Sequence, residues 1–529
     1  MDLRGERRRL DGGLSSASTT PREDEYDVIV VGCGLGGISA AALLAKAGQK
    51  VLAVERQDGV GGCAHAFRRG PYLFDPAIHV LEEAKDGRFI DIVLRYLEVR
   101  EEVDLIRVAD LYRTSFPDFS LKVPFGHEEI VDAHVDAFPE EADAVRGFFD
   151  LHRRFFHEAS HLAMSISFKD LDQAVDQFPV FFKYRNATVG AVLDEYFQGE
   201  RAKGVCSSIW PYMGLPPSRL SWFTFSQLSS VLIDGGSYYC RGSFQKLADA
   251  FVTALERNGG ELVVGNQVSS IIVDDERVRG IRLADGSEVR APVVISNADA
   301  RHTLEELVGV EHLPTGFVRR LQRMEPSFSA FVIYAATSLD LEEQGAAHEA
   351  FLYKHWDHEA THRDILDGRP GGMWANVPTL EDPSLAPDGE HLVILTSLAP
   401  YEIGKPWAEE GERYAEQMLR DFDEALFPGL RDNLTFMETA SPLTLERFTL
   451  NHRGAIYGWA VTPNQTGTKR LAHDSPVEGL YLSGHWTHEG PASFRVILSG
   501  IMTGRLVLEH AGLGDTVPTF RPADMPQTS

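Results

Sequence analysis

Apolar residues near the start of the chain follow the pattern of a strand–helix–strand unit. The run YDVIVVG from Tyr26 is almost wholly apolar, as in a buried parallel strand. The Ala-rich segment ISAAALLAKAG, which ends at Gly48, predicts a helix, and KVLAVE, which ends at Glu55, predicts a second buried strand. Together the three segments predict a βαβ unit, the building block of a doubly wound parallel sheet.

Beyond Gly62 the alternation of strands and helices stops. Residues 86–234 are predicted to be helical and rich in aromatic side chains, and residues 243–258 form another predicted helix. Three short strands follow, with a tight hairpin turn at Asp285-Gly286, and the segment EVRAPVVISNADA returns as a buried strand. Residues 301–444 mix strands with a helix, and a strand, a loop and a long helix close the pattern.

Composition and charge exclude several classes of protein. The 529 residues carry a net charge of −27 without a basic stripe, which counts against binding to nucleic acid. Four scattered Cys without a C-x-x-C pair favour a reducing compartment, so we expect a cytoplasmic protein. No window has the 18 or so apolar residues of a membrane span, and the first residues lack a signal peptide's apolar region. Arg7, Arg8 and Arg9 leave room for peripheral membrane contact at most.

A glycine-rich turn joins the first predicted strand to the first helix. Gly32, Gly34 and Gly37 fit the pattern G-x-G-x-x-G, which combines a tight turn, close approach of a pyrophosphate and close helix packing. The N-terminus of the helix offers unpaired N–H groups and a positive dipole end to phosphates. Glu55 follows roughly twenty residues later, where a carboxylate accepts hydrogen bonds from ribose hydroxyls. The sequence therefore predicts a dinucleotide site.

Three stretches far apart in the chain resemble the FAD-binding segments of the amine oxidase and phytoene desaturase flavoprotein superfamily. They are the E-x5-G-G run from Glu55 to Gly62, the segment from QVSSIIV to VVISNAD, and GLYLSGHWTHEGPASFRVILSG. Three further stretches, IWPYMGLPPSRLSWF, DGGSYYCRGSFQKLADAF and RGAIYGWAVTPNQTG, look most like the branch of phytoene desaturases, carotenoid isomerases and retinol saturases. The resemblance covers residues 26–512.

The resemblance implies an α/β fold with FAD as the cofactor: a glutathione-reductase-like Rossmann FAD-binding domain with a discontinuous α+β substrate domain. Tails at 1–24 and 516–529 would flank an FAD domain of residues 25–85, 235–300 and 445–515 and a substrate domain of residues 86–234 and 301–444. The residues that it assigns to the cofactor are Gly32, Gly34, Gly36, Gly37, Glu55, Arg56, Gly61, Gly62, Val268, Gly484, Gly490, Ala492 and Ser493.

The resemblance also brings titratable groups to the flavin ring. It places Tyr239 and Arg241 on the flavin face, and His79, His485 and Glu489 are further candidates for catalysis. Glu489 stands where the family turn is commonly neutral, and burial beside an apolar substrate predicts a protonated carboxyl that exchanges a proton. The simpler alternatives are packed or solvated side chains and, for Glu489, a surface carboxylate that caps a helix.

Other patterns have simpler explanations. His358-Glu359-Ala360-Thr361-His362 matches the zincin motif, but it lacks an apolar helix face and a third ligand, so we expect no metal site. Cys63 and Cys240 could attach flavin or act as redox thiols, although small buried cysteines are the simpler explanation. The aromatic residues 148–225 form either a core or a tunnel for a long apolar ligand, and both alternatives stay open.

The predicted function is FAD-dependent oxidoreduction of a hydrophobic polyene or isoprenoid-like substrate. Desaturation, saturation, isomerisation and redox-triggered cyclisation share hydride transfer at flavin N5, and the sequence does not separate them. A bacterial composition leaves room for a natural product such as a polycyclic tetramate macrolactam. No second G-x-G-x-x-G follows a strand, so electrons would come from or go to an outside partner, or the net reaction needs none.

Two alternatives remain on the same scaffold. One is a flavin amine oxidase, which needs an aromatic cage around the flavin. The other is a non-enzymatic escort of prenyl groups, as in the Rab GDP-dissociation inhibitors. The intact set of Gly32, Gly34, Gly37 and Glu55 argues against the escort. The sequence leaves the oligomeric state open.

Overall fold

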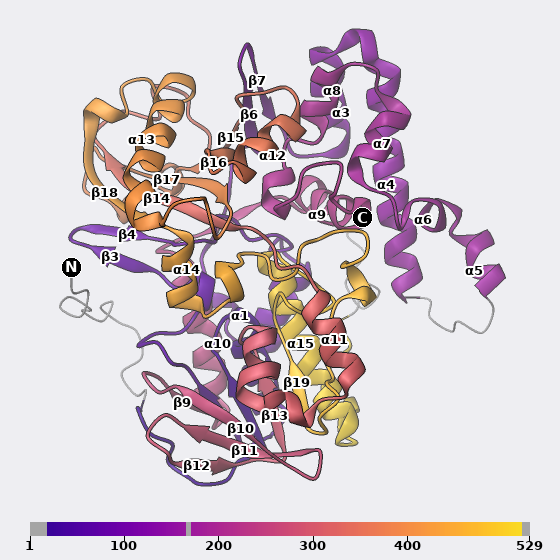
Figure 1. The fold of residues 1–529 in the computed structure, drawn as a ribbon, viewed down its shortest axis with the longest axis vertical. Helices are drawn as coiled ribbons and strands as arrows, with labels where there is room; N and C mark the ends of the chain where they lie inside the picture. Colours follow the sequence, from indigo (N-terminus) through magenta and orange to yellow (C-terminus); the bar gives the residue numbers. More distant parts are fainter. Residues whose placement is uncertain (1–17, 165–170, 521–529) are drawn as a thin grey trace.

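Five parallel strands form the sheet in the lower half of the molecule (Figure 1). In the computed structural model, which describes residues 18–164 and 171–520, these strands lie in the order β19-β13-β1-β2-β9. Every residue of β1 and β2 is buried, as the apolar runs predict. The strands are β1 (Val28–Val31), β2 (Val51–Val54), β9 (Glu261–Val263), β13 (Val293–Ser296) and β19 (Leu480–Leu482).

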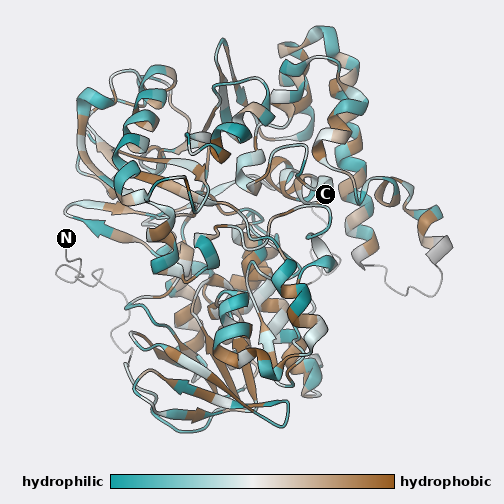
Figure 2. Cartoon of the chain, in the orientation of Figure 1, coloured by the Kyte–Doolittle hydropathy of each residue, from teal (hydrophilic) through white to brown (hydrophobic). Residues whose placement is uncertain are grey.

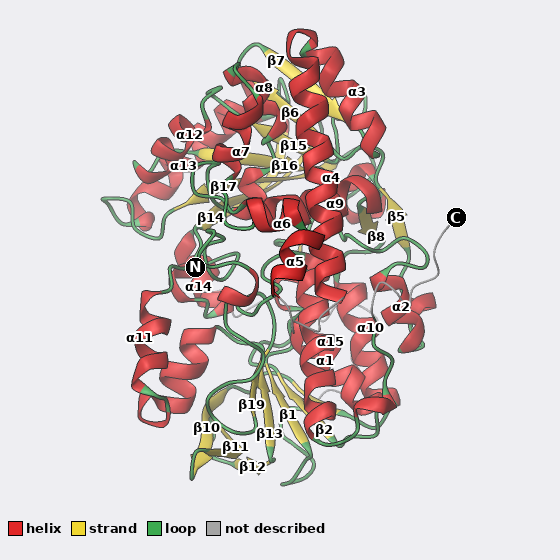
Figure 3. Ribbon diagram, turned by 90° about the vertical axis from the view of Figure 1, so that its right-hand side faces the viewer, coloured by secondary structure: helices red, strands yellow, loops and turns green. Residues whose placement is uncertain are grey.

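The two faces of this sheet are covered by different layers. Val28 and Val30 of β1 pack in one core with the helices, whereas Ile29 and Val31 pack in another with a three-stranded antiparallel sheet. Figure 3 shows the helices beside the sheet, and Figure 2 shows apolar residues gathered where the layers meet. The helices are α1 (Leu35–Lys46), α10 (Gln245–Arg257) and α15 (Ser493–His510), and the strands are β10 (Val268–Asp274), β11 (Arg277–Leu283) and β12 (Glu288–Arg290).

Local sequence signals explain these elements. The βαβ unit β1–α1–β2 is confirmed, and α10 lies within the helix predicted at 243–258. The hairpin turn at Asp285-Gly286 is also confirmed: it joins β11 to β12, and the Asp285 side chain accepts a hydrogen bond from the Ser287 amide at 2.9 Å.

A seven-stranded sheet in the order β18-β14-β17-β16-β15-β6-β7 lies above the first sheet (Figure 1). β6 and β7 belong to the stretch predicted to be helical, so that prediction is wrong at residues 112–123. The strands pair antiparallel across a Pro117-Asp118 turn. The strands are β6 (Tyr112–Phe116), β7 (Phe119–Val123), β14 (Ser329–Thr337), β15 (Glu349–Leu352), β16 (Gly371–Asn376), β17 (His391–Ala399) and β18 (Leu434–Ala440).

Helices complete this upper lobe and cover the junction with the lower one (Figure 3). Within the stretch 86–234 that is predicted to be helical, the long helix α4 confirms the prediction. Two short antiparallel pairs, β3–β4 and β5–β8, lie between the lobes. Two of the helices pack in the cores of the lower lobe, α2 (Phe89–Tyr96) and α11 (Thr315–Arg323). The remaining elements are α3 (His127–Ala137), α4 (Ala142–Met164), α5 (Leu171–Gln177), α6 (Pro179–Tyr184), α7 (Val189–Tyr196), α8 (Glu200–Cys206), α9 (Trp222–Gly235), α12 (His358–Leu366), α13 (Trp407–Ala425), α14 (Pro442–Thr449), β3 (Phe67–Arg69), β4 (Tyr72–Phe74), β5 (Leu105–Arg107) and β8 (Tyr238–Cys240).

Arg7, Arg8 and Arg9 lie outside the described residues, as do residues 521–529. Within residues 18–164 and 171–520, no helix combines the length and the apolar character needed to cross a bilayer.

Helices α1 and α15 approach each other closely because glycine stands at their contact. A Cβ atom on Gly500 would lie only 2.1 Å from the carbonyl oxygen of Gly36 and 2.2 Å from Ser39 Oγ. One helical turn later the contact is looser, since a Cβ on Gly504 would meet a Leu43 methyl group at 3.0 Å. The backbone at Gly500 therefore sets the distance between the helices.

We expect Gly500→Ala to push α15 away from α1 and to lower the free energy of unfolding by about 1–3 kcal/mol, as overpacking does. Gly504→Ala is the control, because a side-chain methyl can rotate away whereas a backbone carbonyl cannot. Thermal unfolding of the two variants would contradict this account if both lose the same stability.

Candidate active site

The N-terminus of α1 is a surface built from glycine backbone. Gly32 has φ +87°, a left-handed conformation that favours glycine. A Cβ on Gly37 would lie 2.1 Å from the Gly32 carbonyl oxygen, so the turn requires a glycine there. α1 begins after Gly34 without a side-chain cap or an acidic residue in its first turn, which leaves its N–H groups available to an anion.

The Gly-Gly pair predicted from the resemblance lies against this turn. The Gly61 amide donates to the Cys33 carbonyl at 2.8 Å, and a Cβ on Gly62 would lie 3.0 Å from Gly34 Cα. Side chains at these positions would fill the cradle. The site thus has the shape and the donors that a pyrophosphate needs.

Glu55 lies beside the cradle at the end of β2. Its carboxylate accepts hydrogen bonds from the amides of Cys33 at 2.9 Å and Gln57 at 2.8 Å. Burial raises the pKa of Glu55, and these backbone donors oppose that shift. The Asn266 amide, two residues before Val268, donates to the Glu55 carbonyl at 3.2 Å, so the segment of Val268 that is predicted to bind the cofactor adjoins the predicted ribose ligand.

Arg56 has a different environment. Its guanidinium donates to the carbonyl of Arg447 at 2.8 Å and to that of Phe448, at the C-terminal end of α14. This contact fits the negative end of a helix dipole. A contact of Arg56 with the cofactor stays a prediction.

Asn297 is a central residue that the sequence analysis did not single out. Its amide lies among three glycines: Cβ atoms on Gly34, Gly36 and Gly484 would lie 2.8, 2.6 and 2.7 Å from its side-chain N or O atoms. Asn297 directly follows β13, where the carboxyl ends of parallel strands meet. A polar residue at that point is the signal that could have found it.

Arg470 holds the loops that face the start of α15. Its side chain is buried, and its guanidinium donates to backbone carbonyls of Trp459 at 3.0 Å, Thr487 at 2.8 Å and His485. Burial lowers the pKa of Arg470 to about 9, and Arg495 adds to the shift. Nothing in the local sequence TKRLAHD singles out this arginine.

The predicted protonation of Glu489 is wrong. Its carboxylate accepts a hydrogen bond from Thr487 Oγ1 at 2.9 Å and pairs with His473 Nε2 at 3.1 Å. Burial alone would raise the pKa of Glu489, but the charge and hydrogen bonds of His473 and Thr487 outweigh it and lower the pKa to about 2. Burial would lower the pKa of His473, yet Glu489 raises it. The two groups form a buried ion pair.

The first turn of α15 is strained and already holds a carboxyl group. Ala492 precedes the helix with φ 128° and ψ 154°, a conformation almost restricted to glycine. Ser493 Oγ donates to Glu82, which the Phe494 amide also reaches at 3.4 Å. Burial raises the pKa of Glu82. Gly490, with φ +75°, lies beside the Arg470 guanidinium.

Several of the predicted catalytic residues lie in one buried region between the lobes. Tyr239 donates to Asp75 at 2.6 Å, and burial raises the pKa of Asp75 to about 7. The Tyr239 ring lies 5.7 Å from that of His348, whose Nε2 is 3.0 Å from the His79 carbonyl oxygen.

The two candidate histidines are held neutral by their surroundings. Burial and the neighbouring His348 lower the pKa of His79 to about 3. Burial and Arg470 lower the pKa of His485 to about 3 as well. Both are therefore neutral at physiological pH.

The structure does not bring the other candidates together. Arg241 is half-exposed and pairs with Asp104 at 2.7 Å, and its place on the flavin face stays a prediction. In the zincin-like motif, Glu359 accepts from Ser218 Oγ at 2.8 Å and His358 Nε2 lies 2.9 Å from the Gly204 carbonyl. The described residues contain no cluster of metal-ligating side chains. Cys63 is exposed and Cys240 is buried, and neither is in a disulfide.

Comparisons with known proteins identify the family of this chain. A profile of the flavin containing amine oxidoreductase family matches residues 35–508. The chain is 26% identical over 540 residues to prolycopene isomerase 1 of an Oncidium hybrid (97% of this chain, 88% of that protein). It is 27% identical over 503 residues to the neurosporene-forming phytoene desaturase of Rhodobacter capsulatus (90% and 93%) and 26% identical over 550 residues to rat all-trans-retinol 13,14-reductase (94% and 86%).

The fold agrees as well. A solved structure of putrescine oxidase with putrescine has a TM-score of 0.62 at 14% identity, covering 92% of this chain and 99% of that chain. The chain belongs to the flavin containing amine oxidoreductase family. Within that family it is one of the relatives of phytoene desaturases, carotenoid isomerases and retinol saturases.

The glycine cradle at α1, the carboxylate of Glu55 and the open N–H groups fit FAD. The predicted cofactor, the predicted fold class and the assignment as an FAD-dependent oxidoreductase are therefore confirmed. The individual contacts of the residues predicted to bind FAD stay predictions.

We expect Glu55→Ala to weaken FAD binding by about 30–160-fold, because a charge-assisted hydrogen bond to ribose is worth roughly 2–3 kcal/mol. Glu261→Ala is the control: Glu261 is a buried carboxylate at the neighbouring strand that accepts from Tyr26 at 2.5 Å. Titration of FAD into deflavinated protein, followed by flavin fluorescence, measures the affinity. An equal loss in both variants would refute a ribose contact of Glu55.

We expect Glu489→Gln to lower the melting temperature by about 5 °C at pH 6, because it breaks a buried ion pair. The folded pKa of His473 is raised, so its stabilising contribution is present below the unfolded value of about 6.5 and is lost as pH rises through the folded pKa. The difference from wild type should therefore shrink towards pH 9.

Glu478→Gln, which removes an exposed carboxylate that pairs with Arg277, is the control and should change little at either pH. Turnover of Glu489→Gln should stay within about tenfold of wild type. A difference in melting temperature that is independent of pH, together with a turnover loss above about 100-fold, would instead assign the proton exchange to Glu489.

Proposed function

We propose that this flavoprotein acts on a hydrophobic polyene of the carotenoid or retinoid type. Prolycopene, phytoene and retinol appear in the names of relatives that match almost the whole chain. The observation that carries the proposal for this chain is a line of aromatic rings, which leads from the buried region between the lobes into the upper lobe.

The line begins at His79, which follows β4. Its ring stacks with Tyr212 at a centroid distance of 6.2 Å, and Tyr212 lies 4.7 Å from Phe351 on β15. Phe351 in turn lies 5.4 Å from Tyr112 on β6. Rings at such spacing offer a long apolar surface, which suits a conjugated chain.

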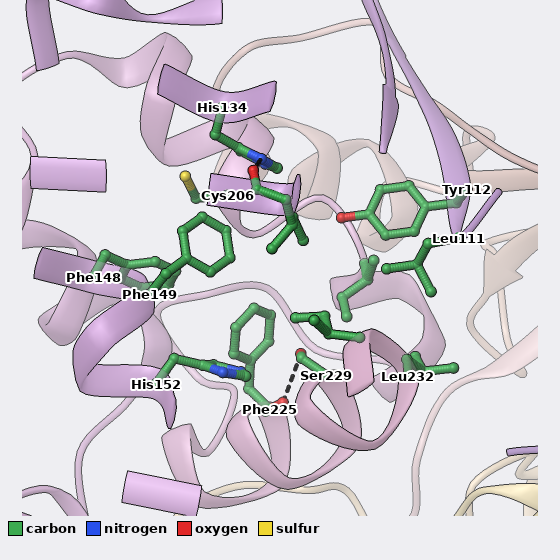
Figure 4. Close-up of a pocket in the computed structure, with 13 residues that line it drawn as sticks. Leu111, Tyr112, His134, Phe148, Phe149, His152, Cys206, Phe225, Ser229 and Leu232 are labelled. Carbon is green, nitrogen blue, oxygen red and sulfur yellow. Dashed lines mark hydrogen bonds between the residues drawn. The ribbon is translucent and has the colours of Figure 1, made fainter. Parts of the chain in front are cut away.

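Tyr112 lines a small cavity at the far end of this path (Figure 4). The cavity of about 20 Å³ lies between β6, α3, α4 and α9, and Phe148 and Phe225 from the predicted aromatic stretch contribute to it. Burial lowers the pKa of its His152 to about 3, so this ring is neutral and the cavity carries no charge from it. We propose that the path and cavity widen by side-chain rotation to take the polyene. Other members of that stretch, such as Trp222, are packed core.

The chemistry divides between cofactor and protein. Bound FAD supplies two-electron redox chemistry. The protein positions the polyene along the aromatic path and excludes water, and the Tyr239–Asp75 hydrogen bond holds a proton at a buried site. Because the pKa of Asp75 is raised to about 7, this pair can bind or release a proton near neutral pH.

We propose desaturation, saturation, isomerisation or redox-triggered cyclisation, with an external electron donor or acceptor where the reaction requires one. A bacterial natural product such as a polycyclic tetramate macrolactam is one substrate of this kind. The similarity to putrescine oxidase, at 14% sequence identity, is one of fold.

We expect anaerobic protein to transfer electrons to or from phytoene, prolycopene or retinol at least about tenfold faster than with putrescine or NADPH. Stopped-flow flavin absorbance and chromatography of the polyene measure the two sides of the reaction. Ser229→Leu should slow the polyene reaction by about tenfold without loss of FAD, because Ser229 lines the cavity. Gln227→Leu, on α9 but outside the cavity lining, is the control. Faster reduction by putrescine than by polyenes would establish the amine oxidase instead.

A further inference from the structure

The inner face of the upper sheet carries polar side chains where a hydrocarbon path would need none. Glu349 on β15 lies opposite Asn376 on β16, and Phe351 lies opposite Trp374 two residues further on. Residues that alternate with them, such as Met373 and Ala375, pack against α13 on the other face. Glu349 and Asn376 therefore point to the same side as the aromatic path.

None of these polar groups makes an aligned hydrogen bond to a described residue, although the Asn376 amide lies close enough to influence the pKa of both Glu349 and His79. Glu349 is 3% exposed and neither of its carboxyl oxygens is bonded, and Asn376 is 1% exposed and neither of its amide atoms is bonded. Nδ1 of His79, which follows β4 in the region between the lobes, is also buried and makes no hydrogen bond. Buried polar groups are almost always paired, since each unpaired one costs about 1–3 kcal/mol. The cluster is therefore built for a partner that completes it.

The protonation of the cluster is set by its burial. Burial raises the pKa of Glu349 well above its usual range, and the nearby Glu82 adds to the shift. Asn376 favours the ionised form of Glu349, but the two groups are not aligned for a hydrogen bond. Because His79 is neutral as well, the cluster presents a neutral acid, a neutral amide and a neutral imidazole.

We propose that Glu349, Asn376 and His79 bind a neutral, carbonyl-bearing headgroup at one end of the polyene substrate. This inference rests on the proposed function and deepens it: the substrate is an oxygenated polyene and not a pure hydrocarbon. The protonated carboxyl and the amide each offer both a donor and an acceptor, which complement a carbonyl, enol or carboxamide. A hydrocarbon would leave all of these atoms unpaired, and a charged headgroup would meet no counter-charge in the three groups.

The aromatic path gives this headgroup site its direction. Tyr212 and Trp374, whose rings are 5.4 Å apart, lie between His79 and Phe351. With the headgroup at Glu349 and Asn376, the conjugated chain extends from there towards the cavity at Tyr112 (Figure 4).

The test measures binding of two polyenes that share one carbon skeleton, all-trans-retinal and the hydrocarbon axerophthene, to the FAD-loaded protein. Perturbation of the flavin absorption spectrum gives a dissociation constant for each without turnover. We expect wild type to bind retinal at least about tenfold more tightly, and Asn376→Leu to reduce this preference to about threefold or less while FAD content is unchanged. In ligand-free protein the same variant should raise the melting temperature by about 1–3 °C, because it removes two unpaired buried polar atoms.

Two further variants separate headgroup binding from packing. Glu349→Gln keeps a donor and an acceptor and should retain the preference within about threefold, whereas Glu349→Leu should lose it. Ser397→Ala, on the opposite face of the sheet where Ser397 contacts Tyr414 Oη at 3.0 Å, should leave the preference unchanged.

The outcomes are distinct. Equal affinity of wild type for both polyenes overturns the headgroup site and leaves the proposed function standing. Loss of FAD in Asn376→Leu and Glu349→Leu overturns it too, because the cluster would then bind the flavin edge. Binding of neither polyene defeats the proposed function itself.

Discussion

The buried guanidinium of Arg470 holds the site together. Arg470 has its guanidinium in the interior, and its donors reach carbonyls of two loops, residues 457–465 and 485–487. A buried charge is costly unless its hydrogen bonds are satisfied, and here backbone carbonyls satisfy them. Because those carbonyls belong to segments without regular structure, Arg470 takes the place of a sheet or helix in fixing them. The start of α15 and the ion pair of Glu489 with His473 both depend on this scaffold.

Charge is distributed unevenly around the junction of the lobes. On the side of α15, Glu489 and His473 are ionised and satisfied by one another. On the side of the upper sheet, Glu349 and Asn376 are neutral and unpaired. Ionised groups that already have partners stabilise the fold, whereas unpaired neutral groups destabilise it and await a ligand. The low dielectric of the interior therefore strengthens the paired charges on the side of α15 and makes the unpaired polar groups on the side of the upper sheet costly.

The sequence predicted the lower lobe well because its signals are local: continuous apolar strands, the glycine turn and Glu55 identify a nucleotide fold without tertiary information. It failed where long-range contacts decide. β6 and β7 lie in a stretch that is predicted to be helical. β6 pairs with β15, more than 200 residues away, and β7 pairs with β6. Glu489 was predicted to be neutral because no sequence motif indicates that His473 lies beside it. Arg470 and Glu349 escaped notice for the same reason, whereas the position of Asn297 after a buried strand was a usable signal.

The order of the strands in the sheet affects how the protein folds during its synthesis. β1 and α1 emerge early from a ribosome, yet their neighbours β13, β19 and α15 come from residues 293–296, 480–482 and 493–510. During most of synthesis the turn at Gly32 therefore lacks the neighbouring strands and helix that surround it in the folded protein. The contact between Gly36 and Gly500 forms only after α15 has been synthesised. Contacts of such sequence separation form slowly. We therefore expect FAD to bind after translation, once the segments of the lower lobe that the upper lobe separates in the chain have come together.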